Sequence, residues 1–486
     1  MAKKLEVKNL YYNYPAEKKS ILGDISFEVE ENEFFSIVGP SGCGKTTLAL
    51  TLNGLIPKSL GGHLEGNIRI DGKDIKKTGT AELSQKVQIL FQSPESQLFA
   101  LNVQDEISFG LENLNIEWEK IEKNVNESLE KLDIEDLRSR SIEELSSGQK
   151  QKVALASVLA MKPDILILDE PTANLDPKAV KDFLNILKEL KGEMTVILIE
   201  HDMDFVEKFS DRIMLMDSGH IVNIDNPKKM FKDKKFLKIM DPPQKKKQMG
   251  RKLKRKEKEP DKEKVLEIKN LNFKYKNKVP ALKNINLEVG KGELFGILGL
   301  NGSGKSTLAL NIIGLLEGKG GILFKGEDLS GKDVYKRTKN IGYVFQNPHY
   351  QLFEDNVYRE ISFGPKNIAL GEKEVEKRVD HVLNVIGLNS YKKEDPHSLS
   401  VGQMKRVTIA SILAMKPEVI IVDEPDTGLD YRTAKKIMDH IKKLKEEGKT
   451  IILISHNLQL VADYCDRVVY LEEGEVKPIE RFLEAI

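Results

Sequence analysis

The sequence has little cysteine, no long apolar run and no excess of charge of either sign. Its two cysteines, Cys43 and Cys465, provide no disulfide framework, which fits a reducing cytosol. No apolar run approaches the roughly 20 residues that span a bilayer, and no apolar signal core follows the first lysines. We therefore expect any membrane role to come through a partner. Lys+Arg and Asp+Glu both number 76, so no global field draws the chain to nucleic acid or anionic lipid.

The chain of 486 residues is longer than one ordinary core and predicts two or three domains. Its two halves are copies, because matched residues recur at a nearly constant separation. Lys45 and Lys305 lie 260 positions apart, whereas the later pairs lie 254 or 255 apart. Those later pairs are Gln92/Gln346, Gly148/Gly402, Asp169/Asp423, Asp176/Asp430 and His201/His456. The first half therefore carries about six extra residues, expected as a surface loop at 56–63 with His63 solvated.

Continuous apolar runs alternate with helical patterns in both halves, which predicts a parallel α/β core in each. The runs expected to be buried on both sides are 165–168, 195–199, 419–422 and 450–454. Two helical faces are also expected, formed by Trp118, Ile121, Val125, Leu129 and Leu132 and by Val375, Val379, Val382 and Ile386. We predict an α/β fold in which each half is a mixed sheet core with a helical insert, at roughly 93–160 and 347–414.

A basic, proline-containing stretch separates the copies and predicts the domain boundaries. Residues 241–264 hold eleven Lys/Arg against five Asp/Glu and almost no apolar side chains. Such a stretch is expected to stay extended, and 24 residues of flexible coil would span about 25–30 Å. A solvated tether is the favoured interpretation, and contact with anionic lipid or RNA is the alternative. The expected domains are therefore 1–240 and 265–486.

Each half contains a glycine-rich stretch that follows a strand pattern and precedes a helical pattern. The two stretches are Gly39-Pro40-Ser41-Gly42-Cys43-Gly44-Lys45-Thr46 and Gly299-Leu300-Asn301-Gly302-Ser303-Gly304-Lys305-Ser306. Both fit the phosphate-cradling P-loop, in which backbone N–H groups and a lysine bind phosphate and the last hydroxyl binds Mg²⁺. Two occurrences in the same context argue against an ordinary glycine turn.

Further motifs narrow the class of nucleotide site. The apolar runs end in Asp169-Glu170 and Asp423-Glu424, and acids at the carboxyl ends of such strands point into the ligand crevice. The aspartates suit the Mg²⁺ shell and the glutamates suit polarisation of an attacking water. Within the expected helical inserts, Leu145-Ser146-Ser147-Gly148-Gln149 and Leu399-Ser400-Val401-Gly402-Gln403 start helices and predict a second anion site in each half.

With these motifs, both halves resemble the nucleotide-binding domain of ATP-binding cassette (ABC) proteins over nearly all of 1–240 and 265–486. The resemblance implies ATP hydrolysis with Mg²⁺ and head-to-tail pairing, in which each ATP lies between one P-loop and the other half's signature. One site would then use Lys45, Thr46, Asp169 and Glu170 with Ser400, Gly402 and Gln403. The other would use Lys305, Ser306, Asp423 and Glu424 with Ser146, Gly148 and Gln149. Thr47 and Thr307, which follow the P-loops, are included among the expected ATP contacts.

The resemblance also implies roles for residues outside the P-loops. Gln92 and Gln346 match the Q-loop, which senses Mg²⁺ and water, so they are expected both in catalysis and at the metal. His201 and His456 match the switch histidine at the γ-phosphate. Tyr14 and Tyr275 match the aromatic that stacks on adenine, with Tyr11 and Tyr12 as nearby competitors. The D-loops would be Asn174-Leu175-Asp176 and Gly428-Leu429-Asp430.

Some positions depart from the family pattern. The middle signature glycine is Ser147 in one half and Val401 in the other, which predicts tolerance with asymmetry between the sites. Both glutamates and both histidines are present, so neither site is expected to be inactive. Cys43 lies inside the first P-loop; if its thiol is accessible, alkylation should block that site and ATP should protect it.

The stretches after the Q-loops, 91–110 and 345–364, share the pattern F-Q-x-P-x-x-Q-L-F…V-x-x-[DE]-I-x-F-G. This pattern resembles ATPases of energy-coupling factor importers, including the cobalt and nickel type. The resemblance implies a peripheral ATPase at the cytoplasmic face of the cell membrane, with a T-type coupling component and a substrate-binding S-type component as partners and a vitamin or metal ion as cargo. Glu95 matches an acidic position that can receive the T-component's arginines, whereas the second half has His349 there.

Two other functions stay open on the sequence. One is a soluble twin-cassette ATPase acting on ribosomes or nucleic acid; the short linker, the neutral charge balance and the lack of basic or stacking platforms argue against it. The other is the ATPase of an exporter or a conventional importer, which the Q-loop pattern alone distinguishes. The sequence does not identify the transported substrate.

Overall fold

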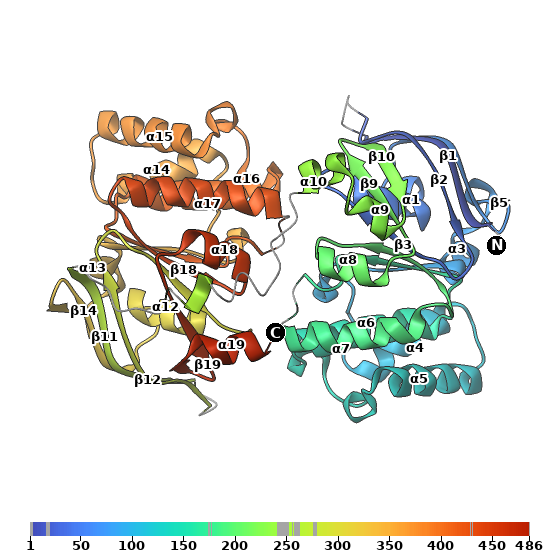
Figure 1. Ribbon diagram of the computed structural model, residues 1–486, viewed down its shortest axis with the longest axis horizontal. Helices are drawn as coiled ribbons and strands as arrows, with labels where there is room; N and C mark the ends of the chain where they lie inside the picture. Colours follow the sequence, from blue (N-terminus) through green and yellow to red (C-terminus); the bar gives the residue numbers. More distant parts are fainter. Residues whose placement is uncertain are drawn as a thin grey trace. The chain divides into compact units, whose positions relative to one another are not determined.

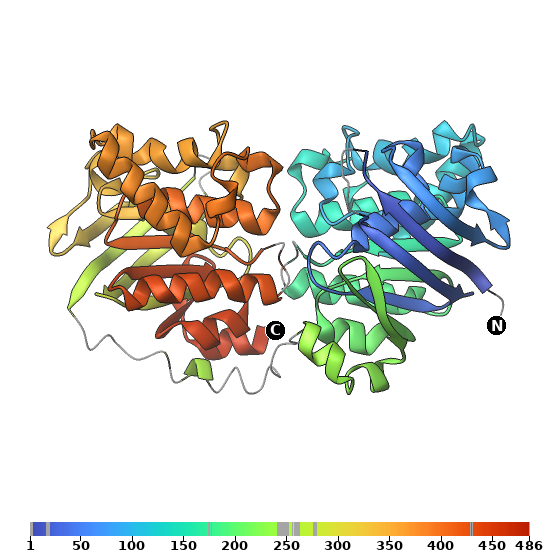
Figure 2. The ribbon, with the colours of Figure 1, turned by 90° about the horizontal axis from the view of Figure 1, so that it is seen from above.

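The computed structural model describes residues 3–15, 20–173, 175, 177–240, 252–254, 256, 263–275, 279–427, 429 and 431–485. The chain divides into two compact units, unit 1 (Met1–Pro242) and unit 2 (Pro243–Ile486). Figures 1 and 2 show that the two units are built from nearly the same succession of strands and helices, with differences at α2 and at the helices that follow the last strands. Within the described part of the chain, no helix combines the length and apolarity needed to cross a bilayer.

Unit 1 contains two sheets. The first is antiparallel, in the order β2-β1-β4-β5, from β1 (Lys3–Asn13), β2 (Leu22–Glu30), β4 (His63–Ile70) and β5 (Lys73–Asp74). The second has the order β10-β9-β3-β8-β7-β6, from β3 (Phe34–Val38), β6 (Val87–Leu90), β7 (Ile165–Asp169), β8 (Thr195–Ile199), β9 (Arg212–Asp217) and β10 (His220–Asp225). Its strands are parallel except for the edge strand β10. The mixed sheet core predicted from the sequence is confirmed.

Helices complete unit 1. They are α1 (Lys45–Leu52), α2 (Leu55–Lys58), α3 (Thr80–Lys86), α4 (Val103–Asn113), α5 (Trp118–Leu132), α6 (Ser147–Ala160), α7 (Pro177–Leu190), α8 (Met203–Phe209), α9 (Pro227–Met230) and α10 (Lys234–Met240). The predicted helical insert corresponds to α4, α5 and α6. Helix α2 has no counterpart in unit 2 and takes up part of the stretch at 56–63 that was expected to be a surface loop. Ile56 there is fully buried, so the loop prediction is wrong for the first residues of this stretch. His63, at the start of β4, is exposed as expected.

Unit 2 repeats this design. Its antiparallel sheet is β12-β11-β14-β15, from β11 (Lys264–Lys274), β12 (Pro280–Gly290), β14 (Lys319–Phe324) and β15 (Glu327–Asp328). Its main sheet is β16-β17-β18-β13-β19-β20, from β13 (Leu294–Leu298), β16 (Ile341–Val344), β17 (Val419–Asp423), β18 (Thr450–Ser455), β19 (Arg467–Glu472) and β20 (Glu475–Lys477). The helices are α12 (Lys305–Ile313), α13 (Val334–Thr338), α14 (Val357–Asn367), α15 (Glu372–Ile386), α16 (Val401–Ala414), α17 (Tyr431–Glu446), α18 (Leu458–Tyr464) and α19 (Ile479–Ala485).

The cores form where the apolar patterns predicted them. Strands β7 and β17 are buried at every position, as expected for central parallel strands covered on both faces. The face of α15 is buried at all four predicted positions, and the face of α5 at four of five. The exception is Trp118, which is 56% exposed. It is the first residue of α5, and the helical face meets the core only from Ile121 onward.

Part of the stretch expected to be a solvated tether instead packs on unit 2. The Leu253 side chain is fully buried in the unit 2 core. The Lys256 ammonium donates to the carbonyl oxygens of Ala462, at 2.8 Å, in the last turn of α18, and of Cys465, which caps that helix. A cation there complements the negative end of the helix dipole. The described residues between 252 and 256 are therefore attached to unit 2.

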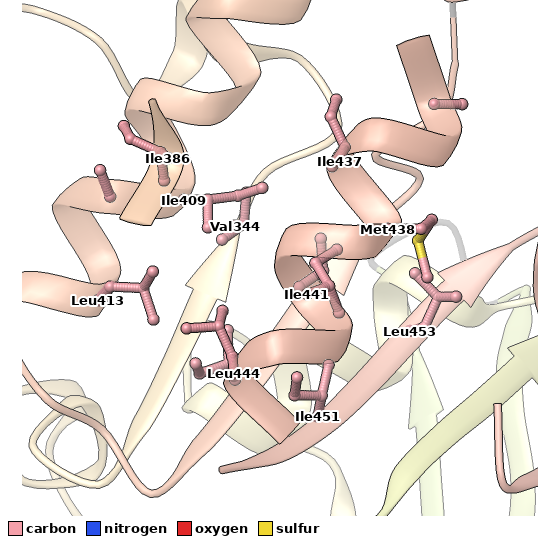
Figure 3. Close-up of a cluster of buried hydrophobic side chains, with 14 of the residues drawn as sticks. Val344, Ile386, Ile409, Leu413, Ile437, Met438, Ile441, Leu444, Ile451 and Leu453 are labelled. Carbon is pink, nitrogen blue, oxygen red and sulfur yellow. The ribbon is translucent and has the colours of Figure 1, made fainter. Parts of the chain in front are cut away.

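Helix α17 provides a test of how this packing stabilises unit 2. Its face of Ile437, Met438, Ile441 and Leu444 packs against β18 and α16 (Figure 3). We expect Ile441→Ala to lower the free energy of unfolding of unit 2 by about 2–5 kcal/mol, because the side chain is fully buried and its removal leaves a cavity. The measurement is urea unfolding followed by hydrogen exchange of unit 2 peptides. The adjacent exposed Lys442→Ala is the control, and equal midpoints for the two variants would contradict this packing.

Candidate functional site

The glycine-rich loops join a central strand to a helix in both units, as predicted. Residues 39–44 connect β3 to α1, and residues 299–304 connect β13 to α12. Gly44 and Gly304 precede the helices with φ of 102° and 103°, a region in which a residue with a Cβ atom is strained. A Cβ atom at Gly39 would lie 2.3 Å from the Met216 carbonyl oxygen. Glycine is therefore required here to bring the backbone N–H groups close to a ligand.

The two P-loop lysines point back over their own loops. Lys45 Nζ donates to the carbonyl oxygens of Gly39 and Pro40, at 2.9 and 3.1 Å. Lys305 Nζ makes the same bonds to Gly299 and Leu300 and lies 3.6 Å from a carboxylate oxygen of Glu424. Both side chains are 5% exposed. Each loop thus holds a buried cation at its centre, ready to bind an anionic group.

The predicted metal residues are brought together at the ends of β7 and β17. The hydroxyl-bearing Thr46 and Ser306 are near enough to Asp169 and Asp423 to lower the pKa of each carboxyl. Burial has the larger effect and raises the pKa of Asp169 to about 6, and burial also raises the pKa of Asp423. Oδ1 of each aspartate is buried without a hydrogen-bond partner. A hydroxyl beside a buried, unsatisfied carboxylate oxygen fits a hard divalent cation.

The predicted catalytic residues also meet in each unit. Gln92 donates to Glu170 at 2.9 Å, and His201 Nε2 lies 2.6 Å from the other oxygen of that carboxylate. Glu170 adopts a φ of 47°, which is unfavourable for a residue with a side chain and typical of functional positions.

Unit 2 repeats this arrangement with a different histidine contact. Gln346 donates to Glu424 at 2.9 Å, and the nearest histidine atom is Nδ1 of His456, at 3.5 Å. Burial alone would raise the pKa of Glu424, but the neighbouring His456 and the charge of Lys305 lower it to about 2. The Glu424 carboxylate is therefore ionised at neutral pH. The φ of Glu424 is 42°.

Tyr14 and Tyr275 lie beside their P-loop helices. Their hydroxyls bond the hydroxyls of Thr47, at 3.2 Å, and Thr307, at 3.0 Å. Tyr12 is fully buried and donates to the Gly61 carbonyl oxygen, so its ring is not available for stacking. Tyr11 alternates with Tyr12 along β1 and is 40% exposed. The structure therefore removes Tyr12 as a competitor, and the choice of Tyr14 over Tyr11 stays a prediction.

The signature serines begin α6 and α16, as expected. Ser146 and Gln149 form a capping box, and Ser400 and Gln403 form the equivalent one. The hollow beside Ser146 is also lined by Gly148, Gln149 and Lys152, and no P-loop residue is among the described residues that line it. Within unit 1, the signature and the P-loop are therefore separate. Val401 is 43% exposed, so its β-branched side chain is accommodated.

The predictions for the D-loops and for Glu95 involve residues that the structure describes only in part. Asn174, Asp176, Gly428 and Asp430 of the expected D-loops lie outside the described residues, as does the side chain of Glu95.

The structure adds contacts that the sequence analysis missed. The Tyr343 hydroxyl donates to Asp423 Oδ2 at 2.7 Å, where unit 1 has Ile89. In unit 1, Thr172 donates to the buried carboxyl of Glu200, the residue before His201. These contacts occur where the copies differ, so aligning the two halves position by position is the signal that would have pointed to them.

Several known proteins are similar to this chain in sequence. The sequence profile of a family described as ABC transporter matches residues 22–173 and 282–427. An ABC transporter ATP-binding protein of Caldanaerobacter subterraneus is 38% identical over 98% of this chain and 91% of its own length. A protein of the same description from Methanosarcina mazei is 36% identical over 96% of this chain and 87% of its own. A solved structure titled cbiO1 from Clostridium perfringens, part of the ABC transporter complex cbiONQ, is 42% identical, covers 46% of this chain and 92% of its own, and has a TM-score of 0.43.

The buried P-loop cysteine gives one prediction. Cys43 is 3% exposed, and burial raises the pKa of its thiol, so the accessibility required for alkylation is not present. We expect iodoacetamide at pH 7.5 to label neither Cys43 nor the equally buried Cys465 in the folded chain, while both label after denaturation. Mass spectrometry of intact protein measures this. Rapid labelling of folded Cys43 would contradict the burial.

Glu200 gives a second prediction, on pH. Burial raises the pKa of Glu200 from 4.5 to about 8, so the folded chain keeps a proton that the unfolded chain releases. Stability is therefore lost as pH rises from about 4.5 to about 8. Because Gln does not ionise, the Tm advantage of Glu200→Gln over wild type should grow from pH 6 to pH 9. Calorimetry measures it, with exposed Glu207→Gln as control; a constant difference across this range would contradict the buried proton.

Proposed function

The chain belongs to the ABC transporter family, and from this premise we propose that it is the energy-supplying subunit of a membrane importer, with both ATPase domains in one chain. Its chemistry is that of the family, ATP binding and hydrolysis coupled to transport. The proposed cargo is a micronutrient, either a vitamin or a transition-metal ion. The proposed partners are an integral membrane T-type coupling component and a substrate-binding S-type component, with the chain peripheral on the cytoplasmic face of the cell membrane.

The main support for a membrane partner is an exposed aromatic pair that recurs after each Q-loop glutamine. In unit 1, Phe99 and Phe109 pack edge to face at 4.4 Å, yet they are 63% and 43% exposed. In unit 2, Phe353 and Phe363 repeat the arrangement at 4.8 Å, with exposures of 61% and 42%. Leaving large apolar side chains in water at the same place in both units is typical of an interaction surface.

One member of each pair, Phe99 or Phe353, lies on a loop that a buried acid holds in place, and the other lies on helix α4 or α14. The buried carboxylate of Glu106 accepts hydrogen bonds from the backbone N–H groups of Phe99 and Ala100, at 3.0 and 2.8 Å. Glu360 holds Phe353 and Glu354 in the same way, both at 2.9 Å. The same acid thus positions the same loop in both units, which favours docking on a preorganised surface.

The two patches differ in their surroundings. In unit 2, Phe353 and Phe363 border an apolar hollow that also includes Phe345, Ile412 and Met415. We propose that this hollow receives an apolar side chain of the coupling component. His349 stacks on His397 at 5.6 Å beside the patch and offers no acidic group. The stronger arginine contact is therefore proposed for Glu95 in unit 1.

We also propose that the ATP sites are composite. The separation of the Ser146 hollow from its own P-loop supports pairing of each signature with the other unit's P-loop. Ser400, Gly402 and Gln403 would then complete the site at Lys45, and Ser146, Gly148 and Gln149 the site at Lys305. In both cases the helix N-terminus would contribute N–H groups to phosphate.

Within each site, the residues have distinct proposed tasks. Lys45 and Lys305 leave their loop carbonyls to bind phosphate oxygens. Thr46 with Asp169, and Ser306 with Asp423, would hold Mg²⁺, which when bound neutralises charge on the phosphates. Gln92 and Gln346, which hydrogen-bond Glu170 and Glu424, would complete the surroundings of this Mg²⁺.

Glu170 and Glu424 would orient the attacking water by accepting its hydrogen bond. His201 and His456 lie 2.6 and 3.5 Å from these carboxylates and would bind the γ-phosphate. Tyr14 and Tyr275 would stack on adenine while their hydroxyls are anchored by the threonines next to the P-loops.

The proposal is tested by purifying the tagged chain from native membranes in mild detergent. We expect wild type to retain small hydrophobic membrane proteins. Phe99→Asp/Phe353→Asp should lose them because each aspartate places a charge in an apolar contact. The ATPase activity of the isolated chain should remain, since neither residue contacts the P-loop. Tyr335→Asp, at an exposed aromatic position on α13, is the matched control and should retain the partners.

Two results would oppose this proposal. Retention of the membrane proteins by the double variant would show that the aromatic pairs do not dock them. Recovery of ribosomes or nucleic acid in place of membrane proteins would support the soluble twin-cassette alternative.

A further inference from the structure

A buried polar cluster lies behind the catalytic glutamate in each unit, and the two clusters are built from different residues. Each cluster contains three residues: one from the helix that the signature begins (α6 or α16), one from the loop after the catalytic glutamate, and the residue directly before the switch histidine. In unit 1 these are Gln151, Thr172 and Glu200, and in unit 2 they are Lys405, Asp426 and Ser455. All except the half-buried Thr172 are less than 8% exposed.

In unit 2, the cluster fastens both ends of the loop that carries Glu424. Lys405 Nζ donates to the backbone carbonyl oxygen of Glu424, at 3.2 Å, and to that of Thr427, at 2.7 Å. The Thr427 hydroxyl in turn donates to the Glu424 carboxylate at 3.1 Å. Lys405 therefore holds Glu424 in two ways. It bonds the main-chain carbonyl of Glu424 directly, and it holds Thr427, whose hydroxyl bonds the Glu424 side chain.

The charge of Lys405 is balanced locally. Burial lowers the pKa of Lys405 to about 8, and the charges of Asp426 and Glu424 oppose this, so the side chain is cationic at neutral pH. Ser455 donates to Asp426 at 3.1 Å and so fixes the carboxylate. Hydrogen bonds from a buried cation are stronger than neutral ones, so this attachment is stiffer than a neutral side chain would give.

Unit 1 lacks this attachment. Gln151 takes the place of Lys405, and its buried amide nitrogen has no hydrogen-bond partner. Ala173 takes the place of Thr427 and has no hydroxyl to donate. The loop is instead tied to the following strand by the bond from Thr172 to Glu200. In unit 2 the carboxylate is on the loop (Asp426) and the hydroxyl is at the strand end (Ser455). In unit 1 the hydroxyl is on the loop (Thr172) and the carboxyl is in the residue before the switch histidine (Glu200).

We propose that Lys405 is a positioning residue for Glu424, and that the clamp it forms makes the ATP site of Glu424 the faster of the two. The inference rests on the proposed role of Glu424 in hydrolysis. Lys405 acts through the Glu424–Thr427 loop and does not itself contact the reacting groups. A small displacement of a positioned group lowers the rate of the chemical step far more than it lowers substrate binding, so the effect belongs to kcat.

The test compares steady-state ATP hydrolysis by the full chain carrying Lys405→Gln or Gln151→Lys. Lys405→Gln gives unit 2 the residue of unit 1, and we expect kcat to fall about fivefold or more while KM for ATP stays within about twofold. Lys405→Arg keeps the positive charge and can still donate the two hydrogen bonds, so its kcat should be at least half that of wild type. In Gln151→Lys, Thr172 stands where unit 2 has Asp426, the carboxylate that balances the lysine charge, and Ala173 has no hydroxyl to pass the contact on to the Glu170 side chain, so this variant should not raise kcat.

Two further variants separate positioning from loss of structure. Lys405→Gln/Asp426→Thr/Ser455→Glu installs the whole unit 1 cluster, leaves no unpaired carboxylate from unit 2, and should fold with a Tm near that of wild type. Its kcat should stay as low as that of Lys405→Gln. Glu424→Gln is the reference for the catalytic role: full activity in that variant would mean that Glu424 itself is not catalytic, which would also overturn the inference.

The decisive outcomes are distinct from those of the docking experiment. An unchanged kcat in Lys405→Gln or in the triple variant would refute the clamp. A rise in KM with unchanged kcat would make Lys405 a nucleotide-binding contributor and would equally overturn the proposal. The isolated chain suffices for these assays, so failure to recover membrane partners leaves their interpretation unaffected.

Discussion

A largely buried carboxylate directly after a central parallel strand is the constraint on which each unit depends. Glu170 and Glu424 follow strands that are apolar except for a final aspartate, Asp169 or Asp423, so their charge must be compensated locally. The compensation comes from the Q-loop glutamine, the switch histidine and, in unit 2, the P-loop lysine. These partners come from different elements, so their meeting depends on the register of the whole sheet. The fold and the site are therefore a single arrangement.

The two units show how far a duplicated scaffold can diverge while keeping this arrangement. Strand order, P-loop geometry and capping boxes recur, and so does the acid that holds the exposed aromatic loop. The differences gather immediately behind the glutamates, at positions that do not touch the P-loops. Glu200 in unit 1 and Lys405 in unit 2 place opposite types of titratable group beside equivalent loops. Divergence of this kind changes how firmly a catalytic residue is held without changing which residue it is.

The sequence was sufficient for features with a local signature. Both P-loops, the buried strands and the helical inserts follow from spacing and apolar period, and the repeat makes each of them visible twice. The sequence analysis did not predict that Trp118 would be exposed, that Leu253 would pack into unit 2, or that Cys43 would be inaccessible. These depend on how neighbouring elements pack. The Lys405 cluster was missed because its members come from three separated segments and look unremarkable singly.

The central claim is that one chain carries two ATP sites, each dependent on its own P-loop lysine. Equilibrium binding of Mg-ATP to wild type, Lys45→Ala, Lys305→Ala and the double variant tests it most directly. Two nucleotides per wild-type chain, one in each single variant and none in the double variant are the predicted result. Two nucleotides bound to either single variant at the wild-type affinity, or only one bound to wild type, would contradict the account.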